Sequence, residues 1–375
     1  MGRAWASIDL TAITANVKRL TEAAGGAAVM AVVKADAYGH GLVPVARAAR
    51  RGGASWLGVA LLEEAVALRL AGDAGRILAW LACPGDDFER CVRFGVDLSA
   101  SDTWMINEIS SAAARVGRPA LVHLKVDTGL GRGGATKAQW ADLVRLAASA
   151  QDQGVLRIVG LWSHFAYADC PDHPTVARQL AQFDEAIDLA ARLGVTPEVR
   201  HIANSAATLT KPSSHYDLVR PGIAVYGISP GPAVGTSRSL GLRPAMTLSA
   251  RLAQVKRLPV GSGISYGHQY VTSAETTVGL VPVGYADGLP RASTNAAHVL
   301  AAGRVRTVAG RMCMDQFVLD FGNDDAWAGD EVVIFGPGDD GEPTADDWAA
   351  ACDTISYEIV TRIGPRIPRV FVGGM

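Results

Sequence analysis

The sequence has little cysteine and little net charge, and each shortage excludes a class of protein. Only 5 of its 375 residues are cysteine, and they are odd in number, scattered, and without a C-x-x-C pair. This pattern argues against a disulfide framework and against a zinc site. We therefore expect no metal and a reducing, cytoplasmic location.

Charged clusters and long apolar runs are also lacking. The formal net charge is -2, without a polybasic run, so we expect neither nucleic acid nor a membrane surface as a partner. No apolar stretch is long enough to cross a bilayer, and the first residues lack the apolar segment of a secretory signal. By contrast, 49% of the residues are hydrophobic, which predicts a large folded core.

Apolar runs alternate with segments of helical period along the first two-thirds of the chain. Several runs are apolar at consecutive positions, as strands buried on both faces are. Eight alternations predict an α/β fold with a closed (β/α)8 barrel of the TIM type. An open doubly wound sheet is the alternative, because the fourth and eighth runs are weak. The runs cover residues 29–34, 55–60, 77–82, 96–99, 120–126, 158–164, 198–203 and 218–220, and the helical segments include 43–51, 61–71, 103–116, 137–149 and 175–193.

The pattern changes after about residue 241, where helical period fades and short β-branched runs appear between glycines and prolines. We therefore predict a barrel over residues 1–240 and an all-β, mainly strand domain over residues 241–375, joined near 227–244. Thr344, with Asp347 three residues on, is a candidate cap for one helix near 344–352. The predicted strands cover 248–255, 277–283, 298–300, 304–308, 316–320 and 331–335.

The first run ends in Lys34, within VVKADAYGHG. In a barrel, functional residues follow the carboxyl ends of the strands. A lysine at that place is partly desolvated, which lowers its pKa and frees a neutral amine for a Schiff base. A surface lysine at the start of a loop is the plainer alternative.

Two more polar side chains follow the fifth and sixth runs. Arg132 stands in the glycine-rich segment KVDTGLGRGG after the fifth run, and the sixth run ends at His164 in SHF. Glycine clusters often mark only a turn, and a lone histidine is more often a core residue than a catalyst. Both side chains nevertheless fall at the same predicted rim.

The seventh and eighth runs end in residues suited to an anion. Asn204 and Ser205 open a helix after the seventh run, and Arg220 precedes Gly222 and Ile223 after the eighth. Loops after these two strands often bind phosphate in barrels, although Asn-Ser is also an ordinary helix cap. A lysine, a phosphate cradle and an arginine on one rim are what pyridoxal 5'-phosphate (PLP) requires.

Ordered motifs along nearly the whole chain resemble those of alanine racemases, the fold-type III PLP enzymes. The resemblance implies racemisation of L-alanine and D-alanine on PLP by two bases, in a homodimer with shared active sites that supplies D-alanine for peptidoglycan. The motifs are VVKADAYGHG, DTGLGR, SHFA, HIANSA, VRPGIAVYG, ISYGH, VGYADGLPR, GRMCMDQ and SYEIVTRIGPR.

The resemblance also implies a role for each matching residue. Lys34 carries the cofactor and is one base, and Tyr266 of the partner subunit is the other. Arg220 faces the pyridine nitrogen, while Arg132 contacts the cofactor's phenolic oxygen and the substrate carboxylate. The remaining implied roles are cofactor binding by Tyr38, His164, Asn204, Ser205, Gly222, Ile223 and Tyr357, substrate binding by Met314, entryway positions at Tyr167, Asp169, Tyr285, Arg291 and Arg311, and a possible carbamylated lysine at Lys125.

Two features of the site residues need a physical reason. A tyrosine with an ordinary pKa of about 10 is a poor base at neutral pH, so we expect a chain Tyr266–His164–Arg220 to assist it. Tyr167 departs from the family pattern, because that position is small in many relatives, and it could reshape access to the site.

Four alternatives differ in what they require of the sequence. A PLP decarboxylase of the same architecture usually places an acidic residue where Arg220 stands. A non-catalytic PLP-binding protein needs the barrel alone, without Tyr266 and Met314. A racemase for serine, lysine or another amino acid remains open, because pocket size depends on packing. A structural protein would bind no PLP.

Overall fold

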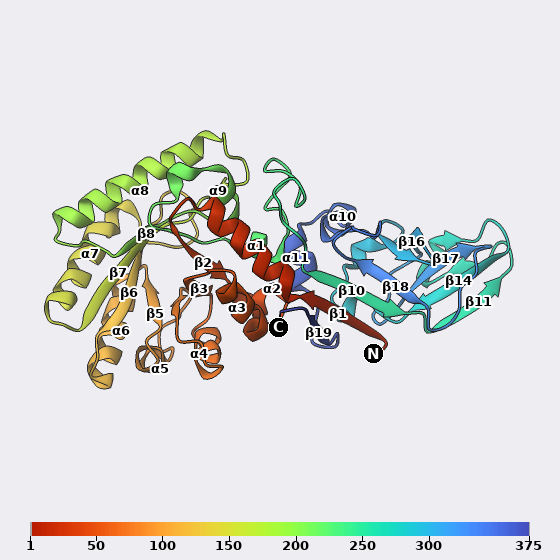
Figure 1. The fold of residues 1–375 in the computed structure, drawn as a ribbon, viewed down its shortest axis with the longest axis horizontal. Helices are drawn as coiled ribbons and strands as arrows, with labels where there is room; N and C mark the ends of the chain where they lie inside the picture. The colour runs from red at the N-terminus through yellow and green to blue at the C-terminus, as the bar shows by residue number, and fades with distance from the viewer. Residues whose placement is uncertain (1, 375) are drawn as a thin grey trace.

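The computed structural model describes residues 2–374 and shows a helix-covered barrel beside a strand-rich domain (Figure 1). The barrel holds an eight-stranded sheet, and most strands of the second domain belong to a nine-stranded sheet. The prediction of a (β/α)8 barrel followed by an all-β domain is confirmed. Within the described range, no helix is long and apolar enough to cross a membrane.

The barrel sheet runs in the order β8-β7-β6-β5-β4-β3-β2-β9, and all its neighbouring strands are parallel. Its two outer strands meet through backbone bonds from Asp217 N to Arg200 O, at 3.1 Å, and from Arg220 N to Ala203 O, at 2.9 Å. These bonds bring the sheet back onto itself, which excludes the open-sheet alternative. The strands are β2 (Ala28–Val32), β3 (Trp56–Val59), β4 (Arg76–Ala79), β5 (Asp97–Ala100), β6 (Ala120–Lys125), β7 (Leu156–Trp162), β8 (Val199–His201) and β9 (Leu218–Val219).

Helices surround the barrel (Figure 1), and several of them begin at a side-chain cap. The Asp9 carboxylate accepts from the backbone N–H groups of Thr11 and Ala12, and Thr136 forms a capping box with Gln139. These caps satisfy N–H groups that have no partner inside the helix. The helices are α1 (Leu10–Ala23), α3 (Leu42–Arg51), α4 (Leu62–Leu70), α5 (Phe88–Arg93), α6 (Thr103–Val116), α7 (Lys137–Asp152), α8 (Pro174–Arg192) and α9 (Ser205–Thr210).

The sheet of the C-terminal domain includes a strand from the start of the chain. β1 (Ala4–Asp9) pairs antiparallel with β10 (Met246–Arg251) and parallel with β19 (Arg369–Val372), and Figure 1 shows it in red beside the strands of this domain. The division at residue 240 stays a prediction, and it did not assign β1 to this sheet. The other strands are β11 (Gln254–Leu258), β12 (Gly263–Ile264), β13 (Tyr270–Val271), β14 (Thr276–Val281), β15 (His298–Ala301), β16 (Arg304–Ala309), β17 (Phe317–Gly322) and β18 (Glu331–Phe335).

Two short helices accompany the C-terminal sheet. α10 (Ala345–Ala351) begins at Thr344, whose side chain caps the helix in a reciprocal pair with Asp347. The expected capped helix is therefore confirmed. α11 (Ser356–Thr361) follows and lies between the barrel and the C-terminal sheet (Figure 1).

The chain leaves β2 through a turn in the left-handed region of backbone conformation, which residues other than glycine rarely adopt. The element α2 (Lys34–Tyr38) has positive φ angles of 54°, 52°, 53° and 52° at Ala35, Asp36, Ala37 and Tyr38. Each left-handed L-residue costs about 1–2 kcal/mol. The strand therefore ends at Val32 rather than at Lys34 as expected, and the turn must be held by its surroundings.

Glu64 holds this turn from α4. Its carboxylate accepts from the backbone N–H of Ala35 at 2.6 Å and from those of Ala60 and Leu61 at 3.0 Å each. We expect Glu64→Ala to lower the free energy of unfolding by about 1–3 kcal/mol, because three N–H groups lose a charged acceptor. Urea unfolding measures the change. Glu63, an exposed residue on the same helix, gives the control. An equal loss of unfolding free energy in Glu63→Ala would contradict this account.

Candidate active site

Lys34 lies at the mouth of the barrel, directly after the strand that presents it. Its Nζ is 6.0 Å from the ring centre of Trp80. Burial lowers the pKa of Lys34, the positive charge of Arg132 lowers it further, and the carboxylate of Glu64 opposes both. The amine is therefore neutral at lower pH than that of a free lysine, which suits a nucleophile or a base.

Ser205 and Gly222 meet at the ends of the last two barrel strands. The Ser205 hydroxyl oxygen accepts from the backbone N–H of Gly222 at 2.7 Å and of Ala224 at 3.3 Å. Asn204 caps α9 by accepting from the backbone N–H of Ala207 at 3.2 Å. The Ser205 hydroxyl hydrogen is left to donate to a ligand, and Ile223 follows directly in this cradle.

Three phenols surround the same cradle. A Cβ at Gly222 would lie 2.4 Å from the Tyr38 hydroxyl oxygen, so only glycine leaves room there. The centre of the Tyr38 ring lies 4.7 Å from that of Tyr226, with the two rings tilted by 31°, and 6.2 Å from that of Tyr357; the Tyr226 hydroxyl donates to Val32 O. Burial raises the pKa of Tyr38 and that of Tyr357, so both remain neutral donors. A small cradle of hydroxyl groups fits a phosphate.

The close approach at Gly222 gives a direct test of the cradle. If the cradle holds PLP, as the family resemblance implies, Gly222→Ala should weaken PLP binding by roughly 5- to 150-fold, because overpacking costs about 1–3 kcal/mol. Equilibrium dialysis of the refolded apoprotein measures the dissociation constant. Gly364→Ala is the matched control, since the nearest atom to a Cβ there is 3.6 Å away. PLP binding by Gly222→Ala at the wild-type affinity would contradict the cradle.

Arg220 is a buried cation that has only neutral partners. Its side chain donates to His201 Nδ1 at 3.0 Å, to His164 Nδ1 at 3.2 Å and to Ser163 O at 2.8 Å. Its guanidinium also lies 4.8 Å from the Trp162 ring. Burial lowers the pKa of Arg220 to about 9, which still leaves a cation at neutral pH. No carboxylate within residues 2–374 forms an ion pair with it.

Further cations make the barrel mouth positive. Burial, together with the charges of Arg220 and Arg132, lowers the pKa of Lys125 to about 8; its Nζ lies 4.4 Å from the Trp162 ring. Burial, again with Arg220 and Arg132, holds the pKa of His164 well below its usual value. His164 is therefore neutral, and the site favours anionic groups such as phosphate and carboxylate.

Tyr167 and Asp169 follow β7 and lie at the outer edge of this site. The Tyr167 ring stacks on His173, with 3.9 Å between ring centres, and is 44% exposed. Asp169 lies close enough to raise the pKa of Tyr357, in addition to the larger effect of burial. The tyrosine at position 167, where many relatives have a small residue, is thus held against His173, the N-cap residue of α8.

The remaining expected site residues form a separate group on the C-terminal domain. Tyr266 is 71% exposed and Met314 is 53% exposed. The backbone N–H of Ala286 donates to Met314 O at 2.9 Å. Across residues 2–374, no hydrogen bond or ion pair joins this group to the barrel-mouth residues, so one chain does not bring the two groups together by such contacts. The group comprises Tyr266, Tyr285, Arg291, Arg311 and Met314.

The expectations from the sequence missed two histidines that support Arg220. His201 accepts from Arg220 at Nδ1, and its Nε2 lies 2.9 Å from His123 Nδ1. A signal for His123 exists in the sequence, because it precedes Lys125 by two residues on one strand. Alternate residues of a strand share a face, so a side chain two positions before a rim lysine points into the barrel.

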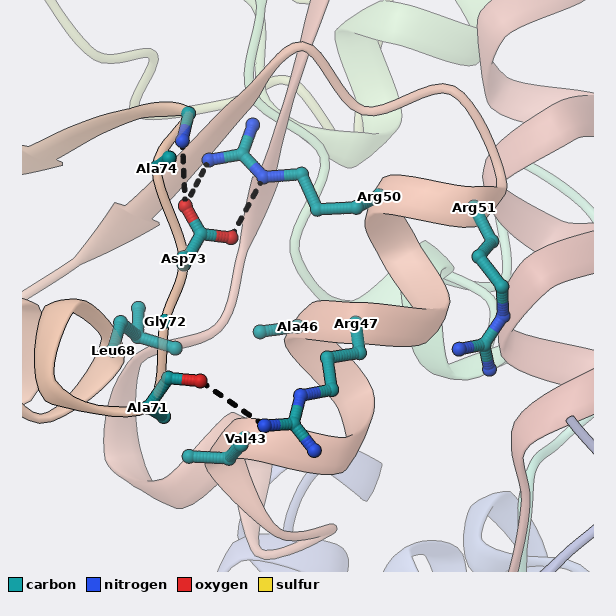
Figure 2. Close-up of a pocket in the computed structure, with 11 residues that line it drawn as sticks. Val43, Ala46, Arg47, Arg50, Arg51, Leu68, Ala71, Gly72, Asp73 and Ala74 are labelled. Atoms are coloured by element: carbon teal, nitrogen blue, oxygen red, sulfur yellow. Dashed lines mark hydrogen bonds and ion pairs between the residues drawn. The ribbon is translucent and has the colours of Figure 1, made fainter. Parts of the chain in front are cut away.

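A cavity of about 440 Å³ lies elsewhere, on the outside of the barrel between α3 and the loop after α4 (Figure 2). Arg47 donates to Ala71 O at 3.0 Å, and Arg50 donates to both carboxylate oxygens of Asp73 at 2.9 and 3.0 Å. These guanidinium groups are already engaged in packing α3 against that loop. None of the expected site residues lines this cavity, and no metal-binding cluster is found among residues 2–374.

Comparisons with known families agree with this arrangement. The N-terminal domain model of alanine racemase matches residues 8–230, and the C-terminal domain model of alanine racemase matches residues 245–371. The alanine racemase of Frankia casuarinae is 58% identical over 370 residues, which are 99% of this chain and 96% of the relative. That of Streptomyces coelicolor is 58% identical over 375 residues, with 99% and 96% covered.

Solved structures give the same result. The alanine racemase of D-cycloserine-producing Streptomyces lavendulae superposes with a TM-score of 0.99 at 55% identity, covering 100% of this chain and 98% of the other. The alanine racemase of Bacillus anthracis with bound L-Ala-P has a TM-score of 0.91 at 33% identity, covering 100% and 96%. From its sequence, its fold and the residues at its barrel mouth, the chain belongs to the alanine racemase family.

Proposed function

We propose that the protein racemises alanine on PLP held at the barrel mouth, with Lys34 and Tyr266 as opposing bases. Membership of the alanine racemase family supports the reaction. The observation that carries the proposal is the convergence of a lysine of lowered pKa, the Ser205–Gly222 cradle and the buried Arg220 at one rim. Arg220 stands where the decarboxylase alternative usually places an acidic residue, which disfavours that alternative.

The residues at the mouth fit PLP by their chemistry. The Lys34 amine would hold the aldehyde carbon, the guanidinium of Arg220 would face the pyridine nitrogen, and Arg132 would contact the phenolic oxygen. The phosphate would be held by the hydroxyl donors of the cradle and by its backbone. When bound, PLP supplies an electron sink for the α-carbon of an amino acid. The proposed phosphate group comprises Tyr38, Asn204, Ser205, Gly222, Ile223 and Tyr357.

Proton transfer then falls to two side chains on opposite faces of the substrate. The neutral Lys34 amine moves a proton at Nζ on one face, and the Tyr266 hydroxyl of the partner subunit moves a proton on the other. His164 assists Tyr266 as a hydrogen-bond donor. Because Arg220 donates to His164 Nδ1, the neutral ring carries its hydrogen at Nε2, where it can donate to the phenolate oxygen.

The substrate carboxylate needs a cation and a donor. We assign these roles to Arg132 and to the backbone N–H of Met314 from the partner. Lys125 lies beside them, and because burial lowers its pKa to about 8, it offers a neutral amine for carbamylation. The negative charge of a carbamate would orient Arg132 and offset the surrounding cations. Tyr167, Asp169, Tyr285, Arg291 and Arg311 are proposed to line the entry.

A homodimer completes each site in this proposal. Tyr266 and Met314 expose 71% and 53% of their surface, although both have side chains with large apolar parts. A second copy that covers them would remove this surface from water and bring them to the neighbouring Lys34. Two-fold symmetry then builds two equal sites from two chains.

The deciding experiment is racemisation of a panel of L-amino acids by the purified protein with PLP. We expect alanine to be the fastest substrate in both directions, and borohydride to fix PLP on Lys34. Faster turnover of serine or lysine would make that amino acid, and not alanine, the proposed substrate. No turnover of any amino acid would reject the proposal. The five cysteines are free thiols, which agrees with the proposed cytoplasmic role in supplying D-alanine for peptidoglycan.

A further inference from the structure

A buried pair of histidines extends inward from Arg220 along the interior of the barrel. His123 and His201 are both fully buried, and His123 Nδ1 lies 2.9 Å from His201 Nε2. The His123 ring meets the Trp56 ring edge-on at 5.4 Å. A Cβ at Gly160 would lie 2.1 Å from His123 Nδ1, so β7 leaves a gap that this imidazole fills.

The hydrogen positions in this pair follow from the one partner that can only donate. Arg220 has no acceptor atom, so His201 Nδ1, at 3.0 Å, must present a lone pair to it. The neutral His201 ring then carries its hydrogen at Nε2 and donates it to His123 Nδ1. His123 is thereby neutral as well, with its own hydrogen at Nε2, pointing away from His201.

Both rings are held in the neutral state. Burial, together with the charges of Arg76 and Arg220, lowers the pKa of His123 to about 3. Burial, followed by the charges of Arg220 and His123, also holds the pKa of His201 well below its usual value. An extra proton on either ring would add a second buried charge beside the guanidinium, where no described carboxylate pairs with Arg220.

We propose that His123 is a positioning residue: by accepting the hydrogen at Nε2 of His201, it secures the tautomer that Arg220 requires and so holds the guanidinium of Arg220 in place. This inference rests on the proposed function, in which Arg220 faces the cofactor's pyridine nitrogen. His123 touches neither substrate nor cofactor and acts only through His201. Its Nδ1 lone pair makes the Nε2–H form of His201 the favoured one, and that form alone accepts a hydrogen bond from Arg220.

Removal of the acceptor at His123 Nδ1 should allow His201 to change its tautomer. His201 would then gain the Nδ1–H form, in which a donor faces the donors of Arg220. A buried cation with few acceptors depends on each of them, so the guanidinium would shift relative to the cofactor ring. The effect should fall on kcat and not on KM, because the substrate carboxylate is bound elsewhere.

The first experiment reads the tautomers directly in the holoenzyme labelled with 15N-histidine. Nitrogen shifts distinguish the Nδ1–H, Nε2–H and doubly protonated forms, and a His201→Gln variant assigns the signals. We expect wild-type His201 and His123 to be neutral with hydrogen at Nε2. A wild-type His201 that carries hydrogen at Nδ1, or is doubly protonated, would overturn the proposal without any variant of His123.

The second experiment compares two replacements of His123. Leucine fills similar space without an acceptor, whereas the Oδ1 of asparagine lies near the former Nδ1. We expect His123→Leu to lower kcat about tenfold, with KM unchanged and Nδ1–H signal appearing at His201, and His123→Asn to restore both. Equal kcat in the leucine variant and the wild type, or failure of asparagine to restore it, would refute the positioning role.

A matched control separates positioning from loss of a buried imidazole. His215 is buried and bonds only backbone carbonyls, those of Ala24, Ala207 and Thr208. His215→Leu should lower stability but leave kcat per folded site unchanged. Failure of the proposed function would give a different result, because Tyr266→Phe would then racemise alanine at the wild-type rate. The His201 tautomer read by 15N shifts would be unaffected by that result.

Discussion

Replacement of Lys34 by alanine should lower kcat for racemisation by at least about 10⁴-fold in both directions. In the proposed mechanism the variant loses both the amine that would hold the cofactor and the base that would serve one face of the substrate, and either loss alone is severe. The lowered pKa of Lys34, caused first by burial and then by Arg132, increases the neutral fraction of this amine at a given pH. Turnover of L-alanine and of D-alanine, each followed by chiral chromatography, measures the effect.

A matched lysine on the surface provides the control for this variant. The Lys137 side chain is 87% exposed and pairs only with Glu185 on the neighbouring helix. Lys137→Ala should therefore racemise alanine at the wild-type rate. If Lys34→Ala kept more than about a hundredth of the wild-type kcat, Lys34 would be neither the cofactor lysine nor a base.

Tyr266→Phe should lower kcat by about 10²- to 10⁴-fold, the usual contribution of one acid–base group. The substitution removes a hydroxyl that bonds no other group among residues 2–374, so the fold should be unaffected. One face of the substrate would keep its base. The variant should therefore still exchange the α-hydrogen of one enantiomer with deuterated solvent, while the other enantiomer exchanges slowly.

Another tyrosine on the same domain separates catalysis from stability. The Tyr270 hydroxyl donates to Asp320 at 2.6 Å, so Tyr270→Phe should lower stability and leave kcat unchanged. Equal exchange of both enantiomers by Tyr266→Phe, at the wild-type rate, would remove Tyr266 from the mechanism.

The two variants together test whether sites are shared between chains. When equal amounts of Lys34→Ala and Tyr266→Phe chains are unfolded and refolded together, half of the dimers should be mixed. Each mixed dimer contains one barrel with Lys34 that faces an intact Tyr266 from its partner. We expect about a quarter of the wild-type activity. A mixture as inactive as its two components would show that both residues act within one chain.

The barrel could be predicted from the sequence because its strands are buried on both faces. Their apolar runs are therefore continuous, and all eight runs match a strand of the barrel within a few residues. The short run that ends in Arg220 became β9 because it pairs with β2. The left-handed turn after Val32 could not be foreseen, since Ala35 and Ala37 show no sign of positive φ. That conformation depends on Glu64, a residue of a later helix.

The candidate site was predictable where residues follow strand ends, as Lys34, Ser205 and Arg220 do. Side chains that act through another residue carry a weaker signal. His123 lies two positions before Lys125, but its partner His201 comes from a distant strand, and only the closed barrel brings the rings together. The proposed contacts between the C-terminal group and the barrel mouth need a second chain, which one chain cannot display.

The order in which the chain is made conflicts with the order in which its strands pair. β1 (Ala4–Asp9) leaves the ribosome first, yet its neighbours β10 and β19 are synthesised only after the whole barrel. Ala6 and Ile8 are fully buried by that pairing, so the nascent chain exposes them throughout barrel synthesis. Such distant pairing is slow. The first segment to be translated is therefore among the last to fold, and a chain released before Arg369 would lack β19, the edge strand that pairs with β1.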